Sequence, residues 1–139
     1  MISLQPCSDL AAAAVLTLSN MQDYYQQHDV DWDAKQIEAV TRDLMNFDIL
    51  ADGQIVGVMR LCFDETSCTV RDLQVIPLYQ NQGIGAQALE KAKRMTQKQG
   101  LKQMQLRVFS ISPAVQFYQR FGFTINNQDE RFYYMVLGL

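Results

Sequence analysis

The chain has 139 residues, enough for one domain with a single hydrophobic core and too few for two. Hydrophobic residues make up 48% and charged residues 19%, proportions that describe an ordinary globular protein and exclude a disordered or fibrous chain. The net charge of −3 gives no electrostatic reason to expect a nucleic acid partner.

Residues that bind metals or form disulfides are few. The three cysteines, Cys7, Cys62 and Cys68, lack C-x-x-C spacing, and His28 is the single histidine. We therefore expect neither a disulfide nor a metal site. The N-terminus lacks the basic start and long apolar core of a signal peptide, and no apolar run reaches membrane-spanning length. These features predict a cytoplasmic protein without a membrane partner.

The first third of the chain predicts a short strand and two helices. Alternation at 2–4 is typical of a strand, and Ser8 or Asp9 can cap a helix over 10–27. Asp33 can cap a second helix, which places four apolar residues on one side. These are Ile37, Val40, Leu44 and Phe47.

Three consecutive antiparallel strands are predicted next. Two strand-like runs at 49–51 and 54–61 flank Asp52-Gly53, a dipeptide that suits the left-handed backbone of a hairpin turn. A second turn at 64–67 leads into another strand over 68–75. This segment of the sequence therefore predicts a meander.

The stretch from Pro77 to Ala86 joins the last of these strands to a helix. Pro77 lacks the donor that a strand ladder needs, while Gly83 and Gly85 remove side chains where the helix begins. The unpaired N–H groups and partial positive charge of a helix start favour phosphate oxygens. The loop is a candidate anion site, although a lone G-x-G favours the alternative of a tight turn. A P-loop is disfavoured, since no Lys-Ser/Thr pair follows Gly85.

The last part of the chain predicts a strand, a short helix and a closing hairpin. Gly100 can end the preceding helix, and the order strand, helix, strand implies a right-handed parallel crossover. Ser112 can cap the short helix, with Pro113 at its first position and Gly122 after its end. The strands are predicted at 104–109, 123–125 and 132–137.

Two motifs in this order resemble those of the GNAT N-acetyltransferase superfamily. Gln80-Asn81-Gln82-Gly83-Ile84-Gly85 resembles its Q/R-x-x-G-x-G/A signature, and residues 112–123, with Phe117-Tyr118 and Gly122-Phe123, are similar to its N-P-A-x-x-F-Y-x-x-x-G-F element. The segment 73–77 is also similar to the family's L-x-V-x-P run. The resemblance implies an α/β (α+β) fold, one N-acetyltransferase-like domain over 1–139. Its mixed, mostly antiparallel sheet would have six to seven strands and about four helices, and would splay between the strand before the Gln80–Ala86 loop and the following strand.

The resemblance also implies acetyl-coenzyme A as donor and a small-molecule or peptide amine as acceptor. The backbone of Leu73, Gln74 and Val75 would lie along the pantetheine, and Tyr118 would protonate the leaving thiolate. Ser112 stands where the family usually has Asn, so it either contacts coenzyme A or only caps a helix, and we favour the cap. The pyrophosphate would bind the backbone of Gln80, Asn81, Gln82, Gly83, Ile84, Gly85 and Ala86.

The acceptor side and the general base are less defined by the sequence. Asp72 and Glu65 are the acidic candidates for the base, and the competing function is a non-catalytic sensor or interaction module that binds coenzyme A. A homodimer would explain the apolar strand at 132–137, as would protection of that strand within one chain. Acidic and aromatic residues before the sheet suit a cationic amine, although we favour a solvated loop with one buried Trp. They are Tyr24, Tyr25, Asp29, Asp31, Trp32 and Asp33.

Overall fold

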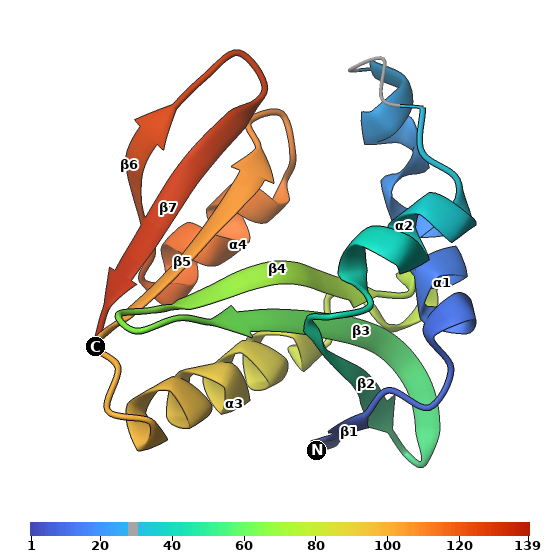
Figure 1. Cartoon of the computed structure of the whole chain (residues 1–139), viewed down its shortest axis with the longest axis horizontal. Helices are drawn as coiled ribbons and strands as arrows, with labels where there is room; N and C mark the ends of the chain where they lie inside the picture. The colour runs from blue at the N-terminus through green and yellow to red at the C-terminus, as the bar shows by residue number, and fades with distance from the viewer. Residues whose placement is uncertain (28–30) are drawn as a thin grey trace.

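The structure, a computed structural model, describes residues 1–27 and 31–139. Within these ranges the strands form one seven-stranded sheet in the order β1-β2-β3-β4-β5-β7-β6 (Figure 1). The strands are β1 (Ile2–Pro6), β2 (Met45–Ala51), β3 (Gln54–Phe63), β4 (Cys68–Val75), β5 (Gln103–Phe109), β6 (Thr124–Gln128) and β7 (Phe132–Gly138). The helices are α1 (Leu10–Gln27), α2 (Ala34–Thr41), α3 (Ile84–Lys98) and α4 (Ala114–Phe121), with a 3-10 turn, η1, at Pro77–Tyr79.

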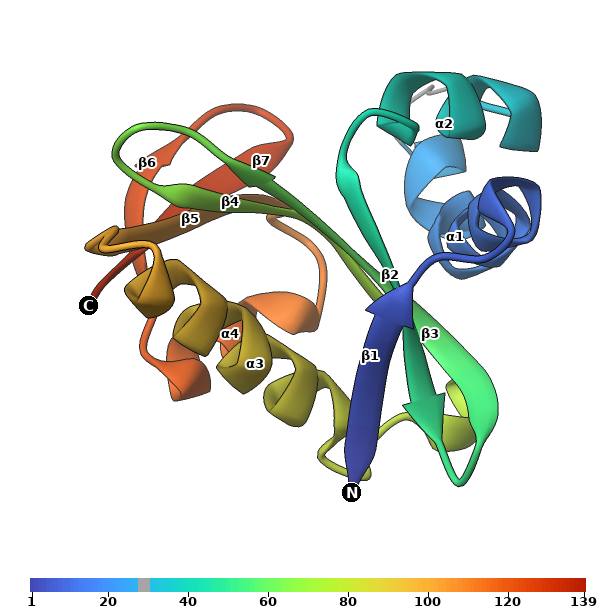
Figure 2. The ribbon, with the colours of Figure 1, turned by 60° about the horizontal axis from the view of Figure 1, so that its bottom comes forward.

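The helices cover the two faces of the sheet unequally. Figure 2 shows α3 and α4 on one side, and α1 with α2 on the other side against the half formed by β1 to β4. Beneath α3 lies the core, where Ala88, Leu89 and Ala92 of the helix pack with Met59 and Leu61 of β3, all fully buried. Because side chains alternate along a strand, Arg60 between these two residues points to α1 instead.

The sheet separates between β4 and β5, as the resemblance implies. These parallel strands pair only at Cys68 with Met104 and at Thr69 with Gln105, and then diverge (Figure 1). On the other side of β4, Leu61 pairs with Val70 but Arg60 pairs with Asp72, so Arg71 is the extra residue of a β-bulge. A bulge bends its strand, which helps β4 to leave the line of β5.

Several local predictions are confirmed. Asp52 and Gly53 adopt left-handed φ angles of 53° and 78° in the β2–β3 hairpin. Asp33 forms a capping box with Gln36 at the start of α2. Asp9 caps α1 by accepting the N–H of Ala12 at 3.1 Å.

The predicted extent of the second helix is wrong. Helix α2 ends at Thr41, and Phe47 lies in β2, where it pairs with Met59. The Asn46 side chain closes the intervening turn by donating to the carbonyl oxygens of Thr41 and Leu44, both at 2.9 Å. Pairing of β2 with strands on both sides therefore outweighs the helical spacing of the apolar residues.

The C-terminal elements also differ slightly from their predicted bounds. Helix α4 begins at Ala114, so Pro113 precedes the first helical residue. Strand β6 continues through Gln128, because the polar residues after Ile125 pair with β7 around a bulge. Strand β7 pairs with β5 and β6, so its apolar character is explained within one chain.

Candidate active site

A cleft of about 1850 Å³ opens where β4 and β5 separate. Residues from α1, β4, the loop before α3, β5 and α4 line it. Gln82 does not line it; its exposed side chain donates to the carbonyl of Leu78 at 3.3 Å. The predicted site residues that line it are Leu73, Gln74, Val75, Gln80, Asn81, Gly83, Ile84, Gly85, Ala86, Ser112 and Tyr118.

The open edge of β4 presents unpaired backbone groups to this cleft. The N–H of Ile76 donates to the carbonyl of Val56 at 2.9 Å, just beyond the last residue of β4, so Ile76 directs its N–H toward β3. Hydrogen-bonded pairs alternate along an antiparallel ladder, and Leu73 and Val75 therefore direct their N–H and C=O groups away from β3. Since β5 has already diverged, these groups point into the opening.

The carbonyl oxygen of Val75 already accepts hydrogen bonds from two side chains of the protein. It accepts a hydrogen bond from Asn20 Nδ2 of α1 at 2.9 Å and another from Gln80 Nε2 at 2.8 Å. Asn20 also donates to the Gln74 side chain at 3.2 Å. These bonds fasten α1 and the loop to the end of β4, and leave the Val75 N–H as the free group there.

The loop before α3 holds a row of free N–H groups. Asn81 and Gly83 adopt left-handed φ angles of 62° and 80°, and the first α-helical bond is from Gln87 to the carbonyl of Gly83. Among the described residues, no acceptor is bonded to the backbone N–H groups from 81 to 86. Together with the dipole of the 15-residue helix, these groups form a site suited to phosphate oxygens.

Gly85 allows α4 to approach this loop closely. A Cβ atom added at Gly85 would lie 3.3 Å from the ring of Phe117, tighter than ordinary van der Waals contact. Phe117 is the residue before Tyr118, so the close contact also fixes where the tyrosine lies. The two motifs of the sequence therefore meet in space.

Tyr118 is buried, with 8% of its surface exposed, and lines the cleft. Its ring packs edge-on against Phe117 and Phe123, with centroid distances of 5.1 and 5.8 Å. Its hydroxyl has no hydrogen-bond partner within the described ranges. Burial, with a smaller contribution from the charge of Asp72, raises the pKa of Tyr118, so the phenol stays protonated at neutral pH.

Asp72 lines the same cleft and is paired with a buried arginine. Its Oδ2 accepts a hydrogen bond from Arg60 Nη1 at 3.1 Å, and the Arg60 side chain is only 1% exposed. Burial raises the pKa of Asp72, while the positive charge of Arg60 opposes this shift. Arg60 was not predicted as a site residue, although a charge inside the apolar run of β3 was a signal for one.

The acidic and aromatic residues before the sheet are only partly brought together. Tyr24, Tyr25 and Trp32 line the cleft, whereas Asp31 and the capping residue Asp33 do not. Residues 28–30, with His28 and Asp29, lie outside the described residues. The other candidate base, Glu65, is exposed in the β3–β4 turn away from the cleft.

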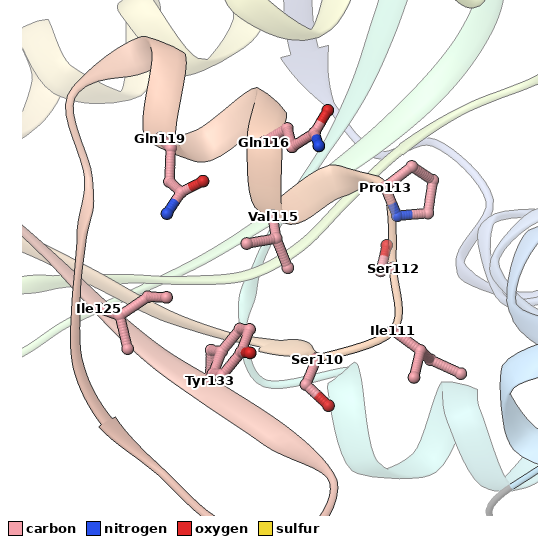
Figure 3. Close-up of a pocket in the computed structure, with 9 residues that line it drawn as sticks. All are labelled: Ser110, Ile111, Ser112, Pro113, Val115, Gln116, Gln119, Ile125 and Tyr133. Atoms are coloured by element: carbon pink, nitrogen blue, oxygen red, sulfur yellow. The ribbon is translucent and has the colours of Figure 1, made fainter.

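Ser112 lies between the cleft and a second pocket of about 510 Å³. Its Oγ accepts the backbone N–H of Ala114, the first residue of α4, at 3.1 Å, but the N-cap residue is Pro113 and not Ser112 as predicted. Figure 3 shows this second pocket between α4, with Val115 and Gln119, and the side chains of Ile125 and Tyr133. The hydrogen bond from Ala114 leaves the hydroxyl hydrogen of Ser112 able to donate.

The model of the acetyltransferase (GNAT) domain family matches residues 46–125, more than half of the chain. The chain belongs to the GNAT acetyltransferase family. A relative from Bacillus subtilis (strain 168), the uncharacterized protein YxbD, is 29% identical over an alignment of 111 residues that covers 74% of this chain. The present chain spans 66% of that relative's length, slightly under two thirds.

Solved structures of other acetyltransferases share this GNAT fold. The PaiA N-acetyltransferase of Thermoplasma acidophilum, solved with coenzyme A, superposes with a TM-score of 0.77 at 18% identity, over 100% of this chain and 99% of its own. The ribosomal-protein-S18-alanine N-acetyltransferase of Escherichia coli gives 0.75 at 20% identity, over 99% and 94%. An acetyltransferase of Thermus thermophilus gives 0.79 at 18% identity, over 100% and 97%. The predicted family and fold are confirmed.

Other features of the GNAT chain concern metals, thiols and membranes. In the described ranges, no group of three or more His, Cys, Asp or Glu side chains is arranged to hold a metal ion. The three cysteines are free thiols. No helix in the part of the chain that the structure describes is both long and apolar enough to cross a bilayer.

Proposed function

We propose that the chain transfers an acetyl group from acetyl-coenzyme A to an amine, with residues 1–139 acting as a single N-acetyltransferase-like domain. The observation that carries this proposal is the row of free N–H groups at 81–86, in line with the free edge of β4. Both lie in a cleft that also contains an unpartnered tyrosine hydroxyl. Unpaired polar groups that converge on one cavity need a polar ligand.

In this proposal the donor lies along β4 and ends at the start of α3. The N–H groups of the Gln80–Ala86 loop bind the pyrophosphate, as the helix dipole favours. The backbone of Leu73, Gln74 and Val75 runs beside the pantetheine. Ser112 keeps one hydroxyl hydrogen for the donor while its Oγ accepts the N–H of Ala114. Gln82 contributes only its backbone N–H to the phosphate site, since its side chain bonds Leu78.

The reaction requires an activated thioester carbonyl, a neutral amine and a proton for the leaving sulfur. Bound acetyl-coenzyme A supplies the acyl group. The free N–H of Val75 is suited to the developing negative charge on the carbonyl oxygen. Tyr118 acts as the general acid, and Asp72, with its raised pKa, is the group best suited to bind the amine and take its proton.

The acceptor is a small-molecule or peptide amine, and the protein works in the cytoplasm. Family members of both kinds share the fold: one solved structure is a ribosomal-protein-S18-alanine N-acetyltransferase and another is a nourseothricin acetyltransferase. A homodimer is not needed for the chemistry, since every group named above comes from one chain.

The proposal is tested by following thiol release from acetyl-coenzyme A with a panel of amines, alongside calorimetric titration of coenzyme A. Tyr118→Phe removes only the hydroxyl, so kcat should fall about 10²–10⁴-fold with unchanged affinity for coenzyme A. Tyr133→Phe is the matched control, because Tyr133 lines the second pocket and not the cleft. Equal turnover by the two variants would contradict the role of Tyr118.

The competing function, a coenzyme A-binding sensor or interaction module, predicts a different outcome of the same experiment. Coenzyme A would bind with no thiol release above background for any amine. The replacement of the family's usual Asn by Ser112 is the observation in its favour. A Tyr118→Phe variant that retains a coenzyme A-dependent response to a partner protein would support the module over the enzyme.

A further inference from the structure

The charges that line the cleft are opposite in sign to the chain as a whole. The net charge of the protein is −3, yet four arginines and only two aspartates line the cleft. None of the four arginines makes a salt bridge within the described ranges. The arginines are Arg71, Arg107, Arg120 and Arg131, and the aspartates are Asp23 and Asp72.

Arg107 is exposed to the cleft and stacks on an aromatic ring of β7. Its guanidinium carbon lies 4.4 Å from the centroid of the Phe132 ring. Phe132 stacks on Phe109 at 4.6 Å, and Phe109 in turn stacks on Tyr24 of α1 at 5.7 Å. Arg107 also interacts with the hydroxyl of Tyr134, and the remaining N–H groups along the edge of its planar fork can bind a carboxylate.

The acidic groups near Arg107 are already bonded elsewhere. The carboxylate of Asp129 accepts the hydroxyl of Tyr134 at 2.7 Å and the N–H groups of Arg131 and Phe132, both at 2.8 Å. The carboxylate of Asp72 is paired with Arg60. The charge of Arg107 still helps to lower the pKa of Asp129, but no salt bridge joins a carboxylate to Arg107 within the described ranges.

The position of Arg107 separates it from the proposed phosphate site. Strand β5 last pairs with β4 at Gln105 and Thr69, so Arg107 and Arg71 are each two residues beyond that pair, where the strands part. The loop that binds phosphate follows Val75, four residues after Arg71, which is about 13 Å along an extended strand. Arg107 thus belongs to the acceptor half of the cleft.

The pKa of Tyr25 is influenced both by Arg107 and by Asp72, one of the proposed reacting groups. Burial and the charge of Asp72 raise the pKa of Tyr25 to about 12, while Arg60 and Arg107 act in the opposite direction. The charge of Asp72 also raises the pKa of Tyr118. Asp72 therefore lies within electrostatic range of both phenols, and Arg107 within range of Tyr25.

We propose that the acceptor is a small amine that also carries a carboxylate, such as a free amino acid, with the carboxylate bound by Arg107 and the amine directed to Asp72. The inference rests on the proposed function and names the substrate class for that site. Arg107 fits a carboxylate because its planar fork matches two oxygens, and the amine end needs the negative charge of Asp72. Arg107 would add no affinity for a cationic amine that lacks a carboxylate.

Matched acceptor pairs test this directly. Each of several L-amino acids is compared with its amide, and kcat/KM is measured by thiol release. The acid should be preferred about tenfold or more, as expected for one charge-assisted bidentate contact. Arg107→Gln should bring the ratio of acid to amide close to one, and Arg107→Lys should keep part of the preference. Arg94→Gln, which removes the same charge from the exposed face of α3, should keep the wild-type ratio.

A binding measurement separates this inference from the proposed function. N-acetyl amino acids, the expected products, are titrated calorimetrically into the protein without acetyl-coenzyme A. Binding should weaken about tenfold in Arg107→Gln and stay unchanged in Arg94→Gln. Amides accepted as well as acids, or an acid preference that survives Arg107→Gln, would overturn the inference and leave acetyl transfer intact. Coenzyme A binding without turnover of any amine would overturn the proposed function itself, while the titration would still test the carboxylate site.

Discussion

Arg60 gives a prediction that links the stability of the fold to the site. Its buried guanidinium donates to Thr17 Oγ1 and Asn46 Oδ1, both at 2.8 Å, and to Asp72 Oδ2 at 3.1 Å. Arg60→Met keeps most of the volume but leaves Asp72 without its counter-charge. Removing one member of a buried ion pair costs about 3–5 kcal/mol, because the remaining charge is left desolvated. At roughly 4 °C per kcal/mol for a chain of this size, the melting temperature should fall by about 12–20 °C near neutral pH.

The loss should depend on pH in a defined direction. Burial already raises the pKa of Asp72 above its ordinary value of 3.8, and loss of Arg60 raises it further. A carboxyl with a higher pKa in the native state binds more protons there than in the unfolded state. Stability therefore falls as the pH rises from 3.8 through the native pKa. The variant should be less destabilised at about pH 5 than at about pH 8.

Urea and thermal unfolding followed by circular dichroism at both pH values measure this effect. The double variant Arg60→Met, Asp72→Asn serves as the control, because it has no carboxyl to titrate and should lose the added pH dependence. A destabilisation by Arg60→Met that is equal at the two pH values would refute the reasoning. So would a loss below about 1 kcal/mol, the value expected of an exposed ion pair.

Two glycines give further predictions for urea unfolding. Gly57→Ala should lower the free energy of unfolding by about 2–3 kcal/mol, since its Cβ would lie 2.3 Å from the carbonyl oxygen of Gln74. Gly138→Ala is the control: a Cβ there meets nothing within 4 Å, and the loss should be less than about 1 kcal/mol. Gly83→Ala should cost about 1–2 kcal/mol, because its φ of 80° is strained for alanine, and should also weaken coenzyme A binding. A Gly83→Ala variant of unchanged stability would show that the loop adopts another conformation in solution.

The elements that the sequence predicts well are those whose signal is local. Asp52-Gly53 needs only its own backbone preference to specify a hairpin, and Asp33 needs only Gln36 to form its capping box. Helix α3 combines helical spacing with a glycine at each end, and its bounds follow closely. Each of these signals lies within a few residues, and no tertiary contact competes with it.

The predictions that fail do so where a distant partner decides the outcome. Phe47 continues a helical spacing with Ile37 and Val40, but the ladder with β1 and β3 takes it into a strand. The role of the Gln80 side chain is a similar case, since its bond to the Val75 carbonyl depends on how the loop folds back on β4. The bond of Gln80 leaves no periodic trace in a single sequence, whereas the apolar–polar alternation at 45–49 is a strand signal that competes with the helical spacing.

The two halves of the cleft differ in the same way, which explains what the sequence can specify about the site. The half that we propose for the donor is built from backbone groups in one continuous segment, 73–86, where glycines and a proline set the geometry. The half that we propose for the acceptor combines side chains of α1, β4, β5 and β7, with Asp72 and Arg107 on strands that pair at only two positions. A motif can encode the first because neighbouring residues suffice. The second half forms only after the sheet has splayed. The role that we propose for Arg107 therefore depends on its contact with Phe132 and its effect on the pKa of Tyr25, which the sequence of β5 alone does not reveal.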